Sequence, residues 1–227
     1  MALKVFSPCI FSPDGIEADR EQKVISGGTS LSGADDTIAT DGGGRWFAQF
    51  SEPYLDEPVI AKTWRALSAH LSGARPIIVR LCDARHQPAG GFVEVPHSDG
   101  TPLSDDTLYV SGETDVRAAT DAPLRATTLA IDVVSLPEDL TGGERFSIQH
   151  PTMLDRAYEI SDIDVDAGTI TFEPPLREAV SAGTPINFED PRCVMRIDGA
   201  MSSPTRMGFA ESPGVRFVEH FPGPGGY

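Results

Sequence analysis

The stretch Arg45-Trp46-Phe47-Ala48-Gln49-Phe50 decides the first part of the fold, because it is rich in aromatic residues and directly follows Gly42-Gly43-Gly44. An aromatic run bounded by turn-forming residues is typical of a β-strand. A second, buried strand is expected over 76–82, where the apolar residues are almost continuous. The segment between these two strands predicts a different kind of element.

That segment carries the clearest helical pattern of the chain, over 57–72. Asp56 is a suitable N-cap, Glu57 and Pro58 suit a first turn, and Gly73 suits a helix exit. Apolar residues recur at intervals of four, three and four, which predicts one stripe packed across a sheet. The stripe consists of Ile60, Trp64, Leu67 and Leu71.

The remainder of the chain predicts further strands separated by irregular segments. Residues 1–45 are expected to be irregular apart from a strand at 3–6, and Leu176–Ser181 is expected to form a short helix. Residues 86–126 contain few apolar residues, and a long weakly structured segment is unusual within a compact domain. We therefore expect this segment to be a projecting arm that becomes ordered by contact with neighbouring molecules. Strands are predicted at 91–95, 107–110, 127–134, 145–148, 157–163, 169–173, 185–188, 193–197 and 215–221.

These elements predict a mostly β fold: a β-sandwich with one packed α-helix, plus an inserted small β-barrel-like module. The sandwich is expected to use 1–85 and 193–227, the arm 86–126, and the module 127–192. The predicted sandwich core is Trp46, Phe47, Ile60, Trp64, Leu67, Leu71, Ile77 and Val79, and the predicted module core is Tyr158, Ile160, Ile170, Phe172 and Leu176.

The charge of the chain is its strongest compositional feature. There are 34 Asp and Glu against 18 Lys and Arg, a formal net charge of −16 in 227 residues. A polyanion repels phosphate groups, so direct binding to nucleic acid or to an anionic membrane surface is not expected. No apolar run is long enough to span a membrane. Residues 1–8 lack the order of a signal peptide, and the three cysteines, Cys9, Cys82 and Cys193, do not form a disulfide framework.

The motifs that usually carry catalysis are not present in the sequence. There is no phosphate-binding Gly-Lys loop, no nucleophile elbow and no zinc-ligand pair of the usual spacing, and the glycine-rich Gly27–Gly33 is expected to be an ordinary loop. The Asp35-Asp36 and Asp105-Asp106 pairs lack the setting of a catalytic acid and base. We therefore expect no enzyme and no cofactor. The histidines are expected to be surface residues: His70, His97, His150 and His220.

Two sets of residues have spacings that suggest metal binding, one made of acidic residues and one of a cysteine and a histidine. Each set has a simpler explanation. Asp162, Asp164, Asp166 and Glu173 occupy positions 1, 3, 5 and 12 of a loop similar to a calcium-binding EF-hand. However, the flanks read as strands and the glycine is one position late, so an exposed hairpin is the favoured interpretation. Cys82 and His86 are four residues apart without a second pair, so a metal site is not expected there either.

One block of residues has a distinctive pattern: Tyr158-x-Ile160, Gly168-Thr169-Ile170-Thr171-Phe172-Glu173-Pro174-Pro175-Leu176-Arg177-Glu178-Ala179, Gly183-Thr184-Pro185 and Asp190-Pro191-Arg192-Cys193-Val194-Met195-Arg196. This block resembles a family of bacteriophage tail proteins, the distal tail proteins of long non-contractile tails. The similarity also extends over 44–83, where the family has an aromatic strand, an amphipathic helix and a strand ending in a turn. At that turn this chain has Cys82-Asp83-Ala84, which departs from the family pattern.

The resemblance implies a structural virion protein, made in the bacterial host cytoplasm and located at the tail tip. It implies a homo-oligomeric ring, usually a hexamer, with the tail tube protein on one face and the baseplate hub protein on the other. The tape-measure protein is a further partner that it suggests. An acidic chain also suits a tube lumen through which DNA must pass without sticking.

Three other functions remain open at this point. One is a carbohydrate- or receptor-binding module of the tail tip, which would need exposed aromatic platforms. Another is a tail polysaccharide hydrolase, which would need a paired acid and base. The last is a tail tube or terminator protein, which also forms rings, although the long insertion over 127–192 favours a distal position.

Overall fold

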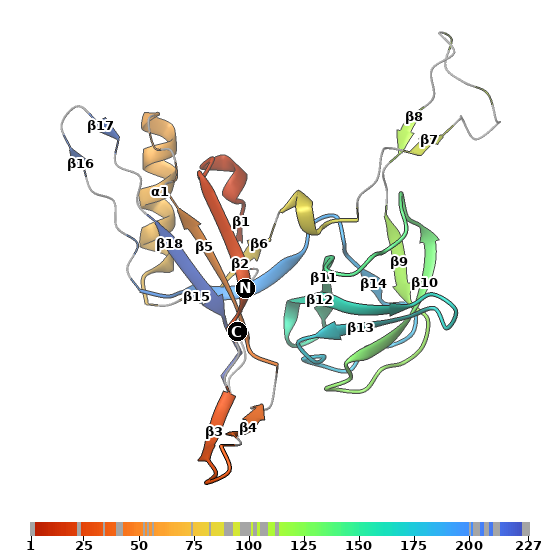
Figure 1. Ribbon diagram of the computed structural model, residues 1–227. Coiled ribbons are helices and arrows are strands. Elements are labelled where there is room, and N and C mark those ends of the chain that lie inside the picture. Colours follow the sequence, from red (N-terminus) through yellow and green to blue (C-terminus); the bar gives the residue numbers. More distant parts are fainter. Residues whose placement is uncertain are drawn as a thin grey trace. The chain divides into compact units, whose positions relative to one another are not determined.

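The computed structural model consists mostly of β-strands with one α-helix, so the predicted mostly β fold is confirmed (Figure 1). The chain divides into two compact units. The first unit comprises 1–82, 149–157 and 191–227, and the second comprises 83–148 and 158–190. The structure describes residues 3–21, 24–33, 35–39, 43–51, 53, 55, 57–73, 75–81, 83–88, 93–95, 101, 104, 109–111, 114–199, 201, 205–206, 209–210 and 214–223.

The first unit is built on a six-stranded sheet in which only the β1–β6 pair is parallel. β6 and β15 are neighbours in this sheet, although the whole second unit lies between them in the sequence. The second unit is therefore an insertion between two paired strands. In sheet order the strands are β1 (Val5–Phe6), β6 (Ile77–Arg80), β15 (Arg192–Ile197), β18 (Val215–Glu219), β5 (Arg45–Ser51) and β2 (Gly15–Glu21), and a 3₁₀ turn, η1 (Pro8–Ile10), follows β1.

The helix α1 (Pro58–Leu71) differs from the predicted 57–72 by one residue at each end. Pro58 occupies the first turn, where its missing N–H is not needed, and Gly73 leaves the helix with φ of +80°. Glu57 is the N-cap, whereas the proposed cap Asp56 lies outside the described residues. The stripe packs against the sheet, with Trp64 and Leu71 buried and Ile60 and Leu67 partly buried.

Phe47 was predicted to lie in the core, and this was wrong. Successive side chains of a strand point to opposite faces, and in β5 the buried face belongs to Trp46, Ala48 and Phe50. Phe47 is half-buried on the other face, where the Arg216 guanidinium carbon lies 4.5 Å from the centre of its ring. The remaining predicted core residues with full burial are Trp46, Trp64, Leu71, Ile77, Val79, Tyr158, Ile160, Ile170, Phe172 and Leu176.

The second unit is a six-stranded sheet that nearly closes into a barrel. Its two edge strands approach each other where Ser147 and Asn187 exchange backbone N–H···O hydrogen bonds of 2.9 Å. Its core contains the aromatic rings of Phe146, Tyr158, Phe172 and Phe188. In sheet order the strands are β11 (Arg145–His150), β12 (Leu154–Asp164), β13 (Thr169–Glu173), β10 (Thr128–Ser135), β9 (Asp115–Ala118) and β14 (Pro185–Ile186), and η2 (Ala84–His86) precedes them.

The boundaries of the inserted module differ from the prediction. Residues 115–118, expected to belong to an arm, form β9, which pairs with β10 and β14 in the barrel-like sheet. Conversely, 149–157 groups with the first unit. The expected helix at 176–181 is not formed, because backbone N–H groups of this segment bond to residues 122–126 instead. Leu176 donates to the Ala126 carbonyl and Val180 donates to the Ala122 carbonyl, both at 2.9 Å.

Three two-stranded hairpins complete the described structure, and each pairs only with itself among the described residues. The expectation that residues 1–45 are irregular was wrong, since β2 and the first hairpin lie there. The first hairpin contains the glycine-rich stretch predicted to be a loop, and Leu31 at its tip is fully exposed. The hairpins are β3 (Val24–Thr29) with β4 (Asp35–Ala39), β7 (Val93–Val95) with β8 (Tyr109–Ser111), and β16 (Thr205–Arg206) with β17 (Phe209–Ala210).

Candidate functional site

The four acids of the EF-hand-like spacing are not brought together. Asp164 opens the turn between β12 and β13, where its Oδ1 accepts a 3.0 Å hydrogen bond from the Ala167 N–H. Glu173 lies at the other end of the hairpin, opposite Glu159. Asp162 and Asp166 are exposed on the hairpin. Within the described part of the chain, no group of three or more His, Cys, Asp or Glu side chains could hold a metal ion.

The described histidines lie in different parts of the structure and do not form a cluster. His86 lies in η2 with its Nδ1 3.0 Å from the Gly143 carbonyl oxygen, and Cys82, the other member of its proposed pair, is outside the described residues. His150 is buried, so the prediction that it is a surface residue was wrong, and His97 is outside the described residues. Burial, followed by the positive charges of neighbouring basic residues, lowers the pKa of His70 and of His220. No described helix is long and apolar enough to cross a membrane.

A buried polar cluster in the first unit was missed by the sequence analysis. Arg156 and Glu219 form an ion pair with 3.1 Å between Nη1 and Oε1, and each side chain is at most 1% exposed to solvent. The Arg156 Nε–H donates to the Met153 carbonyl at 2.9 Å, and the Trp46 backbone N–H donates to Glu219 Oε2 at 3.3 Å. Arg156 also lies over the ring of Phe221, 5.0 Å from its centre. The cluster joins distant segments of one unit and therefore has a structural role.

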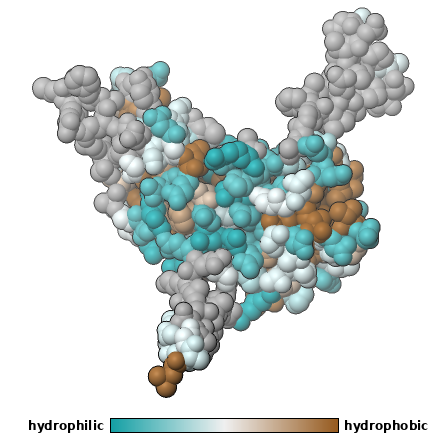
Figure 2. All heavy atoms as spheres, viewed as in Figure 1, coloured by the Kyte–Doolittle hydropathy of each residue, from teal (hydrophilic) through white to brown (hydrophobic). Residues whose placement is uncertain are grey.

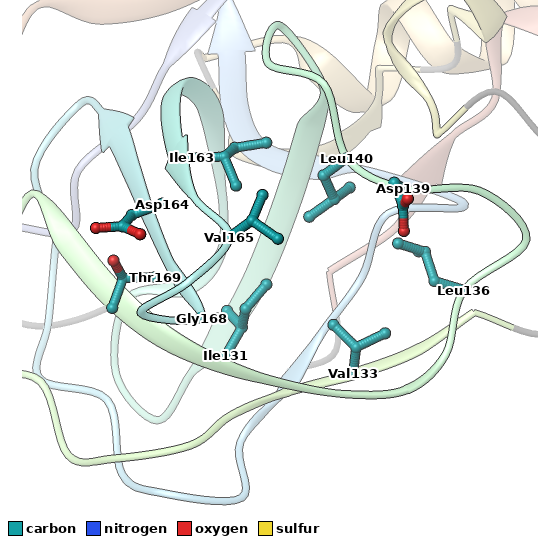
Figure 3. Close-up of a pocket in the computed structure, with 10 residues that line it drawn as sticks. All are labelled: Ile131, Val133, Leu136, Asp139, Leu140, Ile163, Asp164, Val165, Gly168 and Thr169. Atoms are coloured by element: carbon teal, nitrogen blue, oxygen red, sulfur yellow. The ribbon is translucent and has the colours of Figure 1, made fainter.

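The second unit contains an apolar groove beside the β12–β13 turn, with a volume of about 290 Å³. This volume lies near the lower end of the range for ligand-binding pockets. Figure 3 shows its aliphatic side chains gathered between the carboxyl groups of Asp164 and Asp139. The groove is lined by Ile131, Val133, Leu136, Asp139, Leu140, Ile163, Asp164, Val165, Gly168 and Thr169.

Two local irregularities shape this groove. The pairing of β10 with β9 shifts register between Val133 and Ser135, and such a bulge bends a strand and redirects its side chains. On the other side, the turn after Asp164 is closed by Gly168, whose φ of +61° is disfavoured for other residues. The Gly168 carbonyl accepts a 2.9 Å hydrogen bond from the Ile131 N–H, which fixes the turn against β10.

Several aliphatic side chains in and beside the groove are exposed to solvent. Val165 is 82% exposed at the tip of a turn, Val133 is 47% exposed, and the adjacent Val134 is 61% exposed. In the space-filling view, apolar side chains gather over the second unit (Figure 2). Exposed apolar patches of this kind often mark interaction surfaces. The sequence analysis did not find the groove, because Val133 and Val165 are ordinary strand and hairpin residues until the fold brings them together.

A comparison of the chain with models of protein families found no match, and a search of curated proteins likewise found none. The class of protein is therefore inferred from the sequence and the fold alone.

Proposed function

We propose that this chain is a structural ring protein at the distal end of a bacteriophage tail, where it connects the tail tube to the baseplate hub. The observation that carries the proposal is the set of three two-stranded hairpins, each paired only with itself within the described residues. An isolated two-stranded hairpin is marginally stable in water and needs a further surface to pack against. Neighbouring subunits of a ring would supply that surface.

The topology supports the same class of protein. A six-stranded sheet with one packed helix holds a separately cored, barrel-like unit between its neighbouring strands β6 and β15. This combination agrees with the expectation raised by the resemblance to distal tail proteins. In that resemblance, the sheet and helix form the ring, and the inserted unit projects from it.

Leu31 adds a specific point of contact to this proposal. It lies at the tip of the β3–β4 hairpin with its side chain fully exposed, and the hairpin extends away from the sheet of the first unit (Figure 1). Covering this exposed leucine with a second surface removes apolar area from water, which stabilises the contact. The proposed ring therefore uses this hairpin as a contact between subunits.

The acidic composition supports a bore that does not retain DNA. Each chain has a net charge of −16, so a ring of several chains carries a large negative charge. That charge repels the phosphate backbone of DNA passing through the ring. In the proposed ring, acidic residues face the lumen. A ring structure with a neutral or basic bore would overturn this part of the proposal.

The test is the mass of the purified protein in solution, measured by light scattering with and without millimolar calcium. The proposal expects one species of six 24.3 kDa chains. Calcium should leave this mass unchanged, because Glu173 is at the opposite end of the hairpin from Asp164. A Leu31→Ser variant should reduce the mass, whereas Leu124→Ser, at a 56% exposed leucine of the second unit, should not. A monomer at every concentration would contradict a ring that forms on its own.

A further inference from the structure

The groove of the second unit is continuous with that unit's core. Ile131, Leu136, Leu140 and Ile163 line the groove and also pack against the buried cluster beneath it. Their side chains are held by the barrel, so the floor of the groove exists before any partner arrives. A preformed apolar surface loses little conformational entropy when a partner covers it.

Val133 and Val165 extend this floor towards the solvent. Turn tips usually carry small or polar residues, yet Val165 occupies the β12–β13 turn and is 82% exposed. Its backbone is fixed by the hydrogen bonds on either side of it, from the Ala167 N–H to Asp164 and from the Ile131 N–H to Gly168. The valine is thus presented on a rigid turn, as a contact residue would be.

The charges around the groove select the chemistry of the partner. The two chain segments that line it, 131–140 and 163–169, contain five Asp and Glu residues and no Lys, Arg or His. Asp139 and Asp164 line the groove itself, at opposite ends of its aliphatic set in Figure 3. An apolar centre with a carboxyl group at each end complements an apolar segment with a cation at each end.

The same charges disfavour a second copy of this chain as the occupant. The segments that line the groove, 131–140 and 163–169, contain only acidic charges, so the grooves of two copies would repel each other if they met face to face. The lining contains no aromatic side chain, which argues against a stacked sugar ring. A partner of opposite charge remains.

We propose that this groove binds a short segment of another protein in which aliphatic residues are flanked on both sides by lysine or arginine. The aliphatic side chains enter between Val133 and Val165, and the flanking cations lie against Asp139 and Asp164. This inference goes beyond the ring and does not depend on it, because the groove lies wholly within one unit of one chain.

The test uses three fluorescent peptides and the full chain. The first peptide has central leucines with lysines at both ends, the second has glutamates in place of the lysines, and the third has serines in place of the leucines. Binding is followed by fluorescence anisotropy at two salt concentrations. Only the first peptide should bind, and binding should weaken at the higher salt.

Two variants with the same added charge locate the binding. Val165→Lys places a cation in the groove and should weaken binding of the first peptide at least about tenfold, as expected for a central contact. Leu124→Lys adds that charge at an exposed leucine outside the groove lining and should change binding less than about twofold. Urea unfolding of both variants, unchanged from the parent, shows that the fold is retained.

Three outcomes would overturn the proposal. The serine peptide binding as tightly as the leucine peptide would show attraction by net charge alone. Equal losses in the two lysine variants would place the peptide elsewhere on the surface. A change in the mass of the protein in Val165→Lys, with the parent peptide affinity retained, would assign the groove to contacts between copies of this chain.

Discussion

The two units of this chain differ in where they place polar and apolar groups. The first unit encloses a charged pair, Arg156 with Glu219, inside a core that also holds both tryptophans, Trp46 and Trp64. The second unit has an aromatic core around Phe172 and leaves aliphatic side chains in an open groove. A buried ion pair ties segments together, whereas an open apolar groove leaves binding free energy available for a partner. We infer that the first unit is the scaffold, with Leu31 as its contact to a neighbouring subunit, and that the second unit offers its groove to a different protein.

The largest expected effect concerns the scaffold helix. Trp64→Ala removes a fully buried indole and should lower the free energy of unfolding by ~3–5 kcal/mol. Urea unfolding followed by the fluorescence of the remaining Trp46 reports on the first unit alone. Val59→Ala, at a 70% exposed position of the same helix, is the control and should change it by less than about 0.5 kcal/mol. A loss below about 1 kcal/mol for Trp64→Ala would contradict the packing of the helix described here.

The buried ion pair should be almost as sensitive. Arg156→Met leaves Glu219 buried without its cation and should destabilise the first unit by about 3 kcal/mol or more. The double variant Arg156→Met/Glu219→Leu should be more stable than Arg156→Met, because no uncompensated charge remains. In the second unit, Arg145→Met should cost less, since the partner Glu159 is 21% exposed and can be hydrated. Hydrogen exchange in β5 and in β11 measures each unit separately, and additive losses in the double variant would argue against the coupling.

The two faces of β5 give a smaller contrast. Phe47→Ala should cost about 1 kcal/mol, because Phe47 is half-buried and contributes mainly the contact with Arg216. Phe50→Ala, on the core face of the same strand, should cost ~3–5 kcal/mol. Equal losses in thermal or urea unfolding would mean that the strand is shifted by one residue.

The smallest effect is a pH dependence at the start of the second unit. The Arg85 side chain donates hydrogen bonds to the Asp83 carboxylate, and this lowers the pKa of Asp83 to about 2 from its ordinary 3.8. A carboxylate with a lowered pKa stabilises the fold above its unfolded pKa, and that contribution is lost as the pH falls towards about 2. Asp83→Asn should therefore flatten the decline in stability of the second unit between about pH 4 and pH 2. An unchanged slope in acid unfolding would show that this pair contributes nothing.

Local patterns were sufficient to predict several elements of both units. The helix was predictable because the spacing of Trp64 and Leu71 and the positions of Pro58 and Gly73 are all short-range signals. The β12–β13 hairpin was predictable for the same reason. β9 was not, because Asp115-Val116-Arg117-Ala118 has too few apolar residues to indicate a central strand, and its pairing partners are distant in the sequence.

The candidate site depended on such long-range pairing. Arg156 and Glu219 are 63 residues apart, and nothing near either residue indicates that they meet. The groove needs β10 and the β12–β13 turn to lie side by side, and its exposed valines carry no signal of their own. The acidic residues were visible in the sequence, and the favoured interpretation of Asp162, Asp164, Asp166 and Glu173 as part of a hairpin is confirmed, but the pattern did not reveal the groove beside them.

Electron microscopy of the purified protein tests the central proposal most directly. Averaged images should show rings with a central opening and six-fold symmetry, and the Leu31→Ser variant should lose them, with its fold retained. Compact particles of one chain at every concentration, or closed assemblies without an opening, would contradict a ring at the end of a tail tube.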